Sequence, residues 1–567
     1  MLIQSLNQPA GRSLKRFTLG PFPLIHMIAQ RMHLQEILSR YIEPHGNDAI
    51  HPVQTLTLLI YNLAIGKSPL YELEHWCESI DLERIGIARH STKPRHFNDD
   101  RFGKALDKLY AADRASLMTE LVVAYVAEFG VSLDELHNDS TTVKAFGKIP
   151  GTTRSGMELA WGNSKDHRPD LKQLLYTLSI SADGGIPIHH RCYPGNRTDD
   201  TTHIETWNTL RHVADRADFL YVADGKVCSD EQLSHICANG GRVVSVVPET
   251  WGEVGRFKDE QRRTPKAKRI IWRRLKPNSE LESEYFSVFA GNYLTEKRGY
   301  RIHWIYSSEK RKRDRSTREA LLQKAETELT HVNSRLNTRQ FKTEHEIRSA
   351  VDAIISHCQG QGLIRYKLIQ STRHIRKQRG KGRPSFATTY QTVTQTVFSL
   401  TWARDRAALH EESRLDGIFP LLSTDTSLSA KQSLQAYKYQ PRLEKRFSQF
   451  KTIHHAAPLL FKKIERVEAN MFAFFIALAL QALLEREVRT RMHHDKIDKL
   501  YIYPEDRECK RPTTSIIFDR FQAVSRYEIA DSKANITDQL QDSLSEAQHD
   551  ILDSLGISDQ EYWTATG

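Results

Sequence analysis

Three acidic residues of this chain stand in surroundings where an acid has no ordinary structural explanation. Asp139 lies inside the β-rich run "ELHNDSTTV", although aspartate is among the residues most depleted from strands. Asp224 follows the apolar run "FLYVA" and precedes a glycine and a predicted helix, at a strand end where α/β sheets place their sites. Glu444, in "AYKYQPRLEKRFSQFK", is the only acid between Asp425 and Glu465.

Convergent carboxylates would suit the chemistry of phosphodiesters. Hard divalent cations such as Mg²⁺ prefer oxygen ligands. Two such ions about 4 Å apart activate an attacking water or hydroxyl and stabilise the leaving oxygen. Because the chain has 70 aspartates and glutamates, a triple of this kind needs support beyond residue type. Three other acids are interpreted as turn, loop and helix-start residues: Asp183, Asp218 and Asp230.

The segment around Glu444 predicts a helix that presents this acid on one face. Pro441 favours a helix start, because proline is common in the first turn. In an α-helix from there, Glu444 and Lys451 are separated by about 20° around the axis. The neighbouring face is apolar and is expected to pack on a sheet; it comprises Leu443, Phe447 and Phe450.

Hydrophobic periodicity divides the chain into five segments. Residues 1–125 carry apolar residues at three-and-four spacing, which predicts an all-helical domain. Residues 126–250 predict strand, hairpin, helix, strand, helix and strand, a mixed α/β domain with at least five strands. Residues 251–427 are β-rich, with a long charged helix and a basic arm, and predict an inserted unit. Residues 428–495 return to helix, and residues 496–567 form a C-terminal region with an acidic tail.

Composition indicates a globular protein with a polyanionic partner. Hydrophobic residues make up 39% of the 567 residues and charged residues 27%, which excludes a disordered or fibrous chain. The formal net charge of +11 favours association with a polyanion such as nucleic acid. The six cysteines are scattered without a C-x-x-C pair, which argues against a disulfide framework or a zinc ribbon.

The sequence favours a reduced, cytoplasmic compartment and no membrane association. The start, "MLIQSLNQPAGRSLKR", lacks the basic-then-apolar order of a signal peptide. The most apolar run, from Met471 to Leu484, is too short to cross a bilayer and is interrupted by Gln481. It therefore predicts a buried helix.

A stretch without acidic residues separates Asp352 from Asp405 and contains the run "RKQRGKGRPS". It predicts a flexible arm that contacts the DNA backbone, where each neutralised phosphate adds to the salt dependence of binding. A disordered, solubilising loop is the alternative. The residues expected to contact DNA are Arg373, Arg376, Lys377, Arg379, Lys381 and Arg383.

The joint pattern of the three acids resembles the catalytic segments of DDE transposases of bacterial insertion sequences. "NDST", "VADG" and "YKYQPRLEKRFSQFK" look like the three segments, and the last is similar to the signature Y-x2-R-x3-E-x6-K. Tyr437, Glu444 and Lys451 fit this spacing, whereas Gln440 stands where the family has arginine. "GNRTD" and the helix around "RVEANMFAFFIALAL" also resemble this group, so the likeness covers about residues 130–490.

The resemblance implies an α/β fold: an RNase H-like mixed sheet flanked by helices, interrupted by a β-rich insertion and preceded by an all-helical domain that recognises terminal inverted repeats. It implies that Asp139, Asp224 and Glu444 are catalytic and bind two Mg²⁺ ions, with Mn²⁺ as a substitute. The implied partners are double-stranded DNA, both element ends and target, and a second copy of the chain in a synaptic homodimer. Residues of the third segment expected to contact DNA are Tyr437, Arg442 and Lys451.

The leading hypothesis is a metal-dependent transposase of the bacterial cytoplasm that cleaves the ends of its own element and joins the freed strands to target DNA. Two alternatives stay open: a non-catalytic DNA-binding protein descended from such an enzyme, and a structure-specific nuclease without strand transfer. Retention of all three acids argues against the first. The departure at Gln440 suggests that Arg442 makes the phosphate contact of the family arginine.

Two further patterns carry expectations with alternatives. The apolar residues from Leu540 to Leu555 recur at helical spacing with acids between them. They predict an amphipathic helix that docks on the protein's own core or competes with DNA for basic surface. Trp251, Trp272 and Trp304 are interpreted as core tryptophans, with the stacking of an unstacked DNA base, as in relatives, as the alternative.

Overall fold

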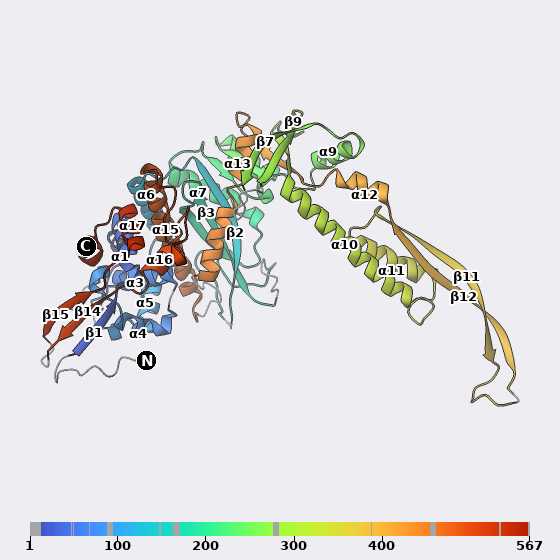
Figure 1. Cartoon of the computed structure of the whole chain (residues 1–567), viewed down its shortest axis with the longest axis horizontal. Helices are drawn as coiled ribbons and strands as arrows, with labels where there is room; N and C mark the ends of the chain where they lie inside the picture. Colours follow the sequence, from blue (N-terminus) through green and yellow to red (C-terminus); the bar gives the residue numbers. More distant parts are fainter. Residues whose placement is uncertain are drawn as a thin grey trace. The chain divides into compact units, whose positions relative to one another are not determined.

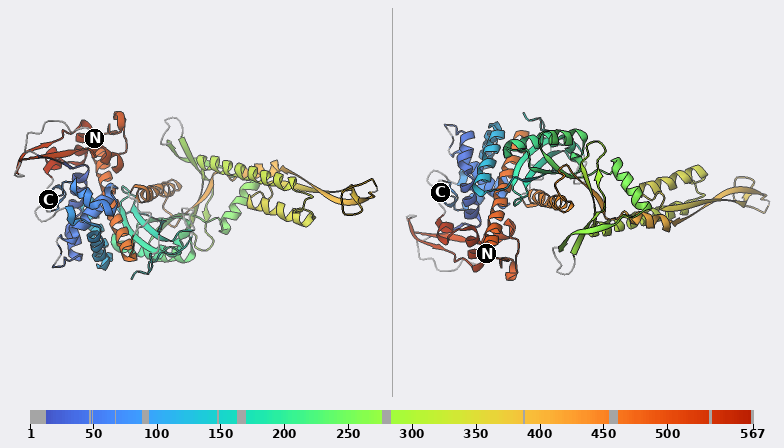
Figure 2. Two further views of the ribbon diagram at one scale, coloured as in Figure 1. Left: turned by 90° about the horizontal axis from the view of Figure 1, so that it is seen from below. Right: turned by 90° about the horizontal axis from the view of Figure 1, so that it is seen from above.

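The structure is a computed structural model of the chain, which divides into two compact units (Figures 1 and 2). The first, here called the core unit, comprises Met1–Ser245 and Gln435–Gly567, and the second, the inserted unit, comprises Val246–Leu434. The three acids singled out above lie in the core unit, and the basic arm lies in the inserted unit. The structure describes residues 13–564 apart from 47, 49, 67, 88–93, 147–148, 163–169, 276–282, 387, 454–460 and 532–534.

A mixed sheet lies at the centre of the core unit, with its strands in the order β4-β3-β2-β5-β6. β2 pairs antiparallel with β3, and β3 with β4, whereas the β2-β5 and β5-β6 pairs are parallel. Every residue of β3 is buried, so both faces of the sheet are covered there. The strands are β2 (Glu135–Lys144), β3 (Gln173–Ser181), β4 (Pro187–Pro194), β5 (Leu220–Val222) and β6 (Arg242–Val246).

The turn from β3 to β4 is the predicted Asp-Gly-Gly hairpin turn. Gly184 and Gly185 have φ of 83° and 70°, values that residues with a side chain rarely adopt. Helices α7 (His203–Ala214) and α8 (Asp230–Ala238) then alternate with β5 and β6. This is the order of strands and helices that the sequence predicted.

Helix α15 (Ile464–His494) is the central helix of the core unit and packs against α1, α3 and α5. It extends well beyond the apolar run seen in the sequence. Among the described residues it is the one helix long and apolar enough to cross a membrane, but the whole of its apolar window is buried inside the protein. The surrounding helices are α1 (Phe22–Arg31), α2 (Leu34–Tyr41), α3 (Pro52–Ile65), α4 (Leu73–Glu78), α5 (Asp99–Ala111) and α6 (Arg114–Phe129).

The N-terminal segment is not all-helical, which corrects the prediction. β1 (Ser13–Thr18) pairs antiparallel with β14 (Ser525–Ala530), and β14 pairs in turn with β15 (Ile536–Gln541). The partners come from opposite ends of the chain, so no local periodicity reveals the pairing. Burial of Phe17 and of the Arg526–Asp81 ion pair anchors this small sheet.

The acidic tail contains a shorter helix than predicted. α17 (Glu546–Leu555) begins after Ser545, which forms a capping box with Gln548. Leu540, the first residue of the predicted helix, lies in β15 and is exposed, because pairing with β14 holds that segment extended. α17 packs against α15 and α16 (Thr514–Phe521), so the tail helix is docked on the core unit; α18 (Asp559–Thr564) follows it.

Within the inserted unit, strands pair antiparallel in the order β13-β10-β8-β7, with β9 paired to β10. Trp304 is buried and stacks on Phe257 with ring centroids 3.8 Å apart, whereas Trp251 and Trp272 are half-buried. The strands are β7 (Lys268–Leu275), β8 (Ser283–Phe289), β9 (Tyr293–Leu294), β10 (Arg301–Ser307) and β13 (Ile418–Ser423). The helices of this unit include α9 (Gly252–Arg263), α10 (Ser308–Ser334), α11 (Glu344–His357) and α12 (Arg406–Ser413).

The predicted flexible arm is a long two-stranded ribbon. β11 (Ile364–Gln378) and β12 (Tyr390–Arg404) pair antiparallel over their full length of 15 residues each, without a register shift. Near its base the ribbon packs on α10 and α11, where Ile364, Phe398 and Leu400 are buried. Arg373, Arg376 and Lys377 lie in the distal part of β11, and Arg379, Lys381 and Arg383 lie in the connection between the strands.

Candidate carboxylate site of the core unit

The sheet register brings Asp139 and Asp224 to the same level of neighbouring strands. In the parallel β2-β5 pair, His137 is opposite Val222. Two residues further along both strands stand Asp139 and Asp224. A parallel pair keeps side chains at equal offsets in step, so the two carboxylates lie at adjacent positions where β5 ends.

Local hydrogen bonds orient both aspartates. Asp139 is half-buried, and its Oδ1 accepts a hydrogen bond of 2.7 Å from the Ser140 N–H. Asp224 caps the helical turn that follows β5, with Oδ1 accepting from the Lys226 N–H at 3.2 Å. His203 Nε2 lies 3.9 Å from the same oxygen. Each carboxylate is thus oriented by a neighbouring backbone N–H and remains partly accessible to solvent.

Glu444 is carried by α14 (Pro441–Ser448), the helix that the sequence predicted to begin at Pro441. Leu443 and Phe447 are buried, and Glu444 is exposed in the first turn of the helix. Phe450 follows and stacks on Tyr176 of β3 with ring centroids 4.7 Å apart. The apolar face therefore packs on the sheet as expected, and the acid stays in contact with solvent.

Gln440 ties the start of α14 to the strand that carries Asp139. Its Nε2 donates to the Asn138 carbonyl at 3.1 Å, and its Oε1 lies 3.0 Å from His137 Nδ1. His137 is fully buried, and its Nε2 lies 2.8 Å from Glu135 Oε1. Gln440 is therefore a buried link between the segments that carry Asp139 and Glu444, and it does not face solvent.

This contact changes the expectation for Arg442. An arginine at position 440 would have to occupy a buried place, so a simple exchange of phosphate contacts between positions 440 and 442 does not describe the structure. Arg442 is half-buried, with Cζ 5.1 Å from the ring centroid of Tyr439. Its guanidinium is held beside the first turn of α14 by this cation–π contact.

Arg446 is the site-forming residue that sequence reasoning missed. The bases around Glu444 were expected to face phosphate, but Arg446 is 5% exposed and points into the protein. Its guanidinium donates to the Gly185 carbonyl at 3.1 Å, to the Gly184 carbonyl at 3.2 Å and to Glu485 Oε2 at 3.1 Å. It thus fastens α14 to the β3-β4 turn and to α15.

The partner carboxylate of Arg446 is itself fully engaged. Glu485 Oε1 accepts from the Thr514 N–H at 3.1 Å and from its hydroxyl at 3.2 Å. Burial alone would raise the pKa of Glu485, but the positive charges of Arg446 and Arg489 lower it overall. A buried, ionised pair of this kind holds the helix in one place.

Tyr437, at the end of α13 (Ala430–Tyr437), is a half-buried phenol whose pKa responds to all three acids. Its pKa is raised to about 12, first by burial and then by the negative charges of Asp224, Asp139 and Glu444. Such charge effects act over short distances inside a protein. Carboxylates from three distant segments of the sequence thus act on the pKa of one phenol.

Lys451, the last residue of the predicted signature, does not continue the α-helix. It is half-buried in the π-helical turn Gln449–Ile453 that follows α14. The angle of about 20° between Glu444 and Lys451 assumed uninterrupted α-helical geometry. That angle no longer holds once the turn widens after Ser448.

The arrangement suits a cation that takes only part of its ligands from the protein. Among the described residues, no three His, Cys, Asp or Glu side chains lie close enough to share one metal ion. Mg²⁺ typically keeps several waters and is bound by one or two carboxylates together with substrate phosphates. The oxygen donors and the partial exposure of Asp139, Asp224 and Glu444 fit that mode of binding.

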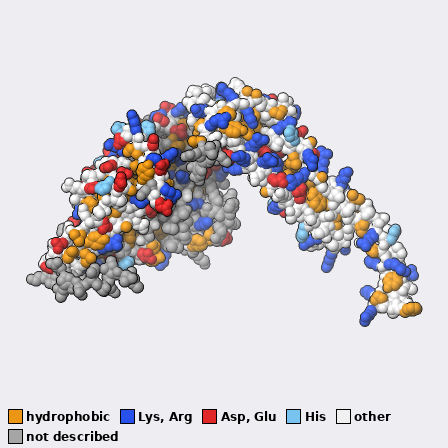
Figure 3. Space-filling view, viewed as in Figure 1, with side chains coloured by type: hydrophobic (Ala, Val, Ile, Leu, Met, Phe, Trp, Pro, Cys, Tyr) orange, Lys and Arg blue, Asp and Glu red, His pale blue; other side chains and the backbone are white. Residues whose placement is uncertain are grey.

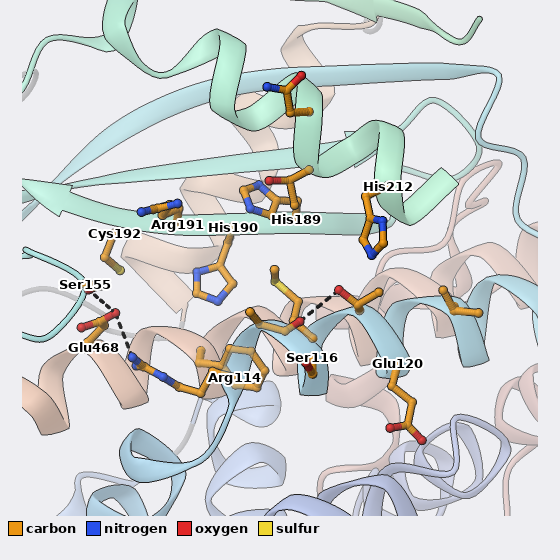
Figure 4. Close-up of a pocket in the computed structure, with 17 residues that line it drawn as sticks. Arg114, Ser116, Glu120, Ser155, His189, His190, Arg191, Cys192, His212 and Glu468 are labelled. Atoms are coloured by element: carbon orange, nitrogen blue, oxygen red, sulfur yellow. Dashed lines mark hydrogen bonds and ion pairs between the residues drawn. The ribbon is translucent and has the colours of Figure 1, made fainter. Parts of the chain in front are cut away.

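A cavity of about 880 Å³ in the core unit was not predicted from the sequence (Figure 4). It lies among β4, α6, α7 and α15, and none of the predicted site residues lines it. Arg114 and Ser155 hydrogen-bond to Glu468 at one side, and His190 extends from β4 towards them. Burial, aided by Arg191, lowers the pKa of His189 to about 4.

Comparison with known proteins gives limited matches. A family model described as a domain of unknown function (DUF4277) matches residues 15–123, the helical front of the core unit. No curated protein matches the sequence. A solved structure titled as the piggyBac transposase synaptic complex with hairpin DNA is similar over 81% of this chain and 74% of its own, at 8% identity and a TM-score of 0.36. A TM-score of this size does not establish a shared fold.

Proposed function

We propose that this chain is a DNA transposase that cleaves phosphodiester bonds at the ends of its element and joins the freed 3′ hydroxyls to target DNA. The observation that carries this proposal is the placement of Asp139 and Asp224 at the same level of two parallel strands, with Glu444 on a helix that Gln440 ties to β2. Their spacing in the sequence resembles the DDE pattern, and their positions on two parallel strands and a sheet-packed helix are compatible with one shared site.

The residues of the site divide into ligands, positioning groups and substrate contacts. Asp139, Asp224 and Glu444 would hold two Mg²⁺ ions, or Mn²⁺ in their place, which activate the attacking oxygen and stabilise the leaving oxygen. Gln440 and Arg446 fix the helix that carries Glu444. This assigns metal binding to exposed carboxylates and positioning to buried side chains.

Tyr437 and its neighbours are proposed to contact the DNA backbone. With a pKa of about 12, Tyr437 keeps its proton at neutral pH, so its hydroxyl donates a hydrogen bond to a phosphate oxygen. Arg442 and Lys451 would supply positive charge on either side of Glu444. Charge-assisted contacts of this kind fix the register of the DNA and leave the choice of sequence to other parts.

The proposed partners are double-stranded DNA and a second copy of the chain. The net charge of +11 favours a polyanion. Terminal inverted repeats and target DNA would be brought together by two chains in a synaptic complex in the bacterial cytoplasm. These partners follow from the resemblance of the sequence to DDE transposases, whose reaction joins element ends to target DNA.

A cleavage assay with the full chain tests the proposal. The substrates are duplexes from either flank of the coding sequence, with Mg²⁺ or with EDTA, and a supercoiled plasmid as target. Cleavage and joined products should require Mg²⁺ and should disappear in Asp139→Ala, Asp224→Ala and Glu444→Ala, with binding to the duplexes retained. Glu231→Ala removes an exposed acid of α8 and is the matched control, with wild-type activity expected.

Three outcomes separate the alternatives. Cleavage without joined products would identify a nuclease. Binding without cleavage by the wild-type chain would identify a non-catalytic DNA-binding protein. A variant of one of the three acids that cleaves at the wild-type rate would remove that residue from the metal site.

A further inference from the structure

The β11-β12 ribbon has a supported base and an unsupported distal half. At the base, Arg404 forms ion pairs with Glu319 and Glu326 of α10, and Arg365 pairs with Asp405. These two arginines are therefore already balanced within the inserted unit. From residue 371 towards the connection, the side chains of β11 are exposed apart from the half-buried Ile375 and Gln378.

The two faces of the distal half differ in composition. Strand alternation and the cross-strand register place Arg373 opposite Gln395, Ile375 opposite Val393 and Lys377 opposite Gln391 on one face, here called the amide face. The other face pairs Thr372 with Thr396, His374 with Thr394 and Arg376 with Thr392. It is here called the threonine face.

Side-chain interactions further distinguish these faces. On the threonine face, Thr394 Oγ1 lies 3.2 Å from His374 Nδ1, and Arg376 Cζ lies 5.5 Å from the ring of Tyr390. Within the described residues, no hydrogen bond or ion pair engages the side chains of Arg373, Lys377, Gln391 or Gln395. The amide face therefore presents its polar groups to a partner.

The chemistry of the amide face matches the edges of base pairs. Arginine and lysine donate to guanine O6 and N7, glutamine makes a bidentate pair with adenine, and aliphatic groups contact the thymine methyl. Residues two apart on one face of a strand are about 6.6 Å apart, close to two base-pair steps of about 3.4 Å. The two cation–amide pairs, four residues apart, would then lie about four base-pair steps from each other.

The surroundings disfavour a basic partner and favour a polyanion such as DNA. Positive side chains gather along this part of the inserted unit (Figure 3), and the sequence has no acid between Asp352 and Asp405. A two-stranded ribbon fits the major groove, which is about 12 Å wide, whereas the minor groove of about 6 Å accepts one only when the DNA is deformed. In that placement, Arg379, Lys381 and Arg383 of the connection would lie near the phosphates that border the groove.

We infer that the distal half of the ribbon enters the major groove of double-stranded DNA and reads bases with the amide face. This inference rests on the proposed function for its partner, and it goes beyond it by assigning sequence preference to the inserted unit. It also replaces the backbone-only contact expected for a flexible arm.

The test is selection from a pool of randomised duplexes with the full chain in EDTA, so that no cleavage is needed. Wild type should enrich a motif, and Gln391→Ala/Gln395→Ala should lose preference at two positions, about 5- to 150-fold per base pair. The matched control, Thr392→Ala/Thr394→Ala on the threonine face, should enrich the wild-type motif. Methylation of guanine N7 in the motif should block binding, because N7 faces the major groove.

Two results would overturn the inference. One is an unchanged motif in the amide-face variant, with Arg373→Ala/Lys377→Ala as a second variant that must agree. The other is interference from methylation of adenine N3, which faces the minor groove, in place of guanine N7. Because selection in EDTA is independent of catalysis, a protein that selects DNA but never cleaves it would refute the proposed function alone.

Discussion

Helix α14 of the core unit and the distal ribbon of the inserted unit are both rich in lysine and arginine, but their charges have different surroundings. In α14, Arg446 is 5% exposed and donates to two backbone carbonyls and one carboxylate. In the ribbon, Arg373 and Lys377 are exposed. A basic run in the sequence therefore does not reveal whether its charges hold the protein together or bind a ligand.

The surroundings of each charge set the cost of removing it. Removing one partner of a buried pair leaves the other charge without compensation, which costs about 3–5 kcal/mol. Exposed charges contribute about 0–1 kcal/mol to stability, so their removal is felt mainly in binding. The comparison thus predicts loss of fold in one region and loss of DNA affinity in the other.

The largest effect is expected for Arg446→Ala. Glu485 would remain buried with Arg489, 3.3 Å away, as its remaining cation, so the free energy of unfolding should fall by about 2–3 kcal/mol, less than for a fully unpaired buried charge, measured by urea denaturation. Lys104→Ala is the control, because Lys104 and Asp100 form an exposed pair at 2.7 Å. Its loss should cost less than about 0.5 kcal/mol. Equal losses of stability in the two variants would contradict the distinction between buried and exposed charges.

A smaller effect, on activity, is expected for Gln440→Ala. The substitution removes the link between α14 and β2, so Glu444 would lose its fixed position relative to Asp139. Cleavage should fall about 10- to 100-fold, as for other residues that orient metal ligands, with DNA binding retained. Arg442→Ala should impair cleavage less, which reverses the order suggested by the sequence. A larger defect in Arg442→Ala would restore the view that position 442 replaces the family arginine.

The smallest effect per residue is expected in the connection of the ribbon. Replacing Arg379, Lys381 and Arg383 by alanine one at a time should weaken binding to all duplexes alike. Each lost phosphate contact should reduce the slope of log K against log salt by about 0.9. Binding measured between low and moderate salt checks this. An unchanged slope would assign these residues to a solvated loop.

Much of the core unit could be predicted because its strands and helices are determined by residues that are close in the sequence. The strand around Asp139, the strand end at Asp224 and the helix start at Pro441 each follow from residues within a few positions. The pairing of Ser13 with Ala530 could not be predicted, because its partners share no local pattern. The burial of Arg446 could not be predicted either, because its partner Glu485 lies in another helix, far away in the sequence.

The ribbon shows a second feature that could not be predicted from the sequence, the pairing of two strands. Glycines and basic residues between residues 376 and 385 suggested a flexible arm, but the strands on either side pair in continuous register. The alternating Thr and Val of β12 were visible as a strand, whereas the pairing with β11 was not. The basic residues of β11 were therefore assigned to a flexible arm that contacts the DNA backbone, because the residues of one strand do not show which strand pairs with it.

The central claim is that Asp139, Asp224 and Glu444 line one site for two metal ions, each of which takes only part of its ligands from the protein. Local cleavage of the polypeptide by bound iron tests this claim most directly. Fe²⁺ binds oxygen-donor sites of this kind, and with ascorbate and peroxide it cuts the backbone close to the ion. We expect cuts near all three residues, suppressed by excess Mg²⁺, lost in Asp224→Ala and retained in Glu231→Ala. Cuts near only one of the three, or an unchanged pattern in Asp224→Ala, would contradict a shared site.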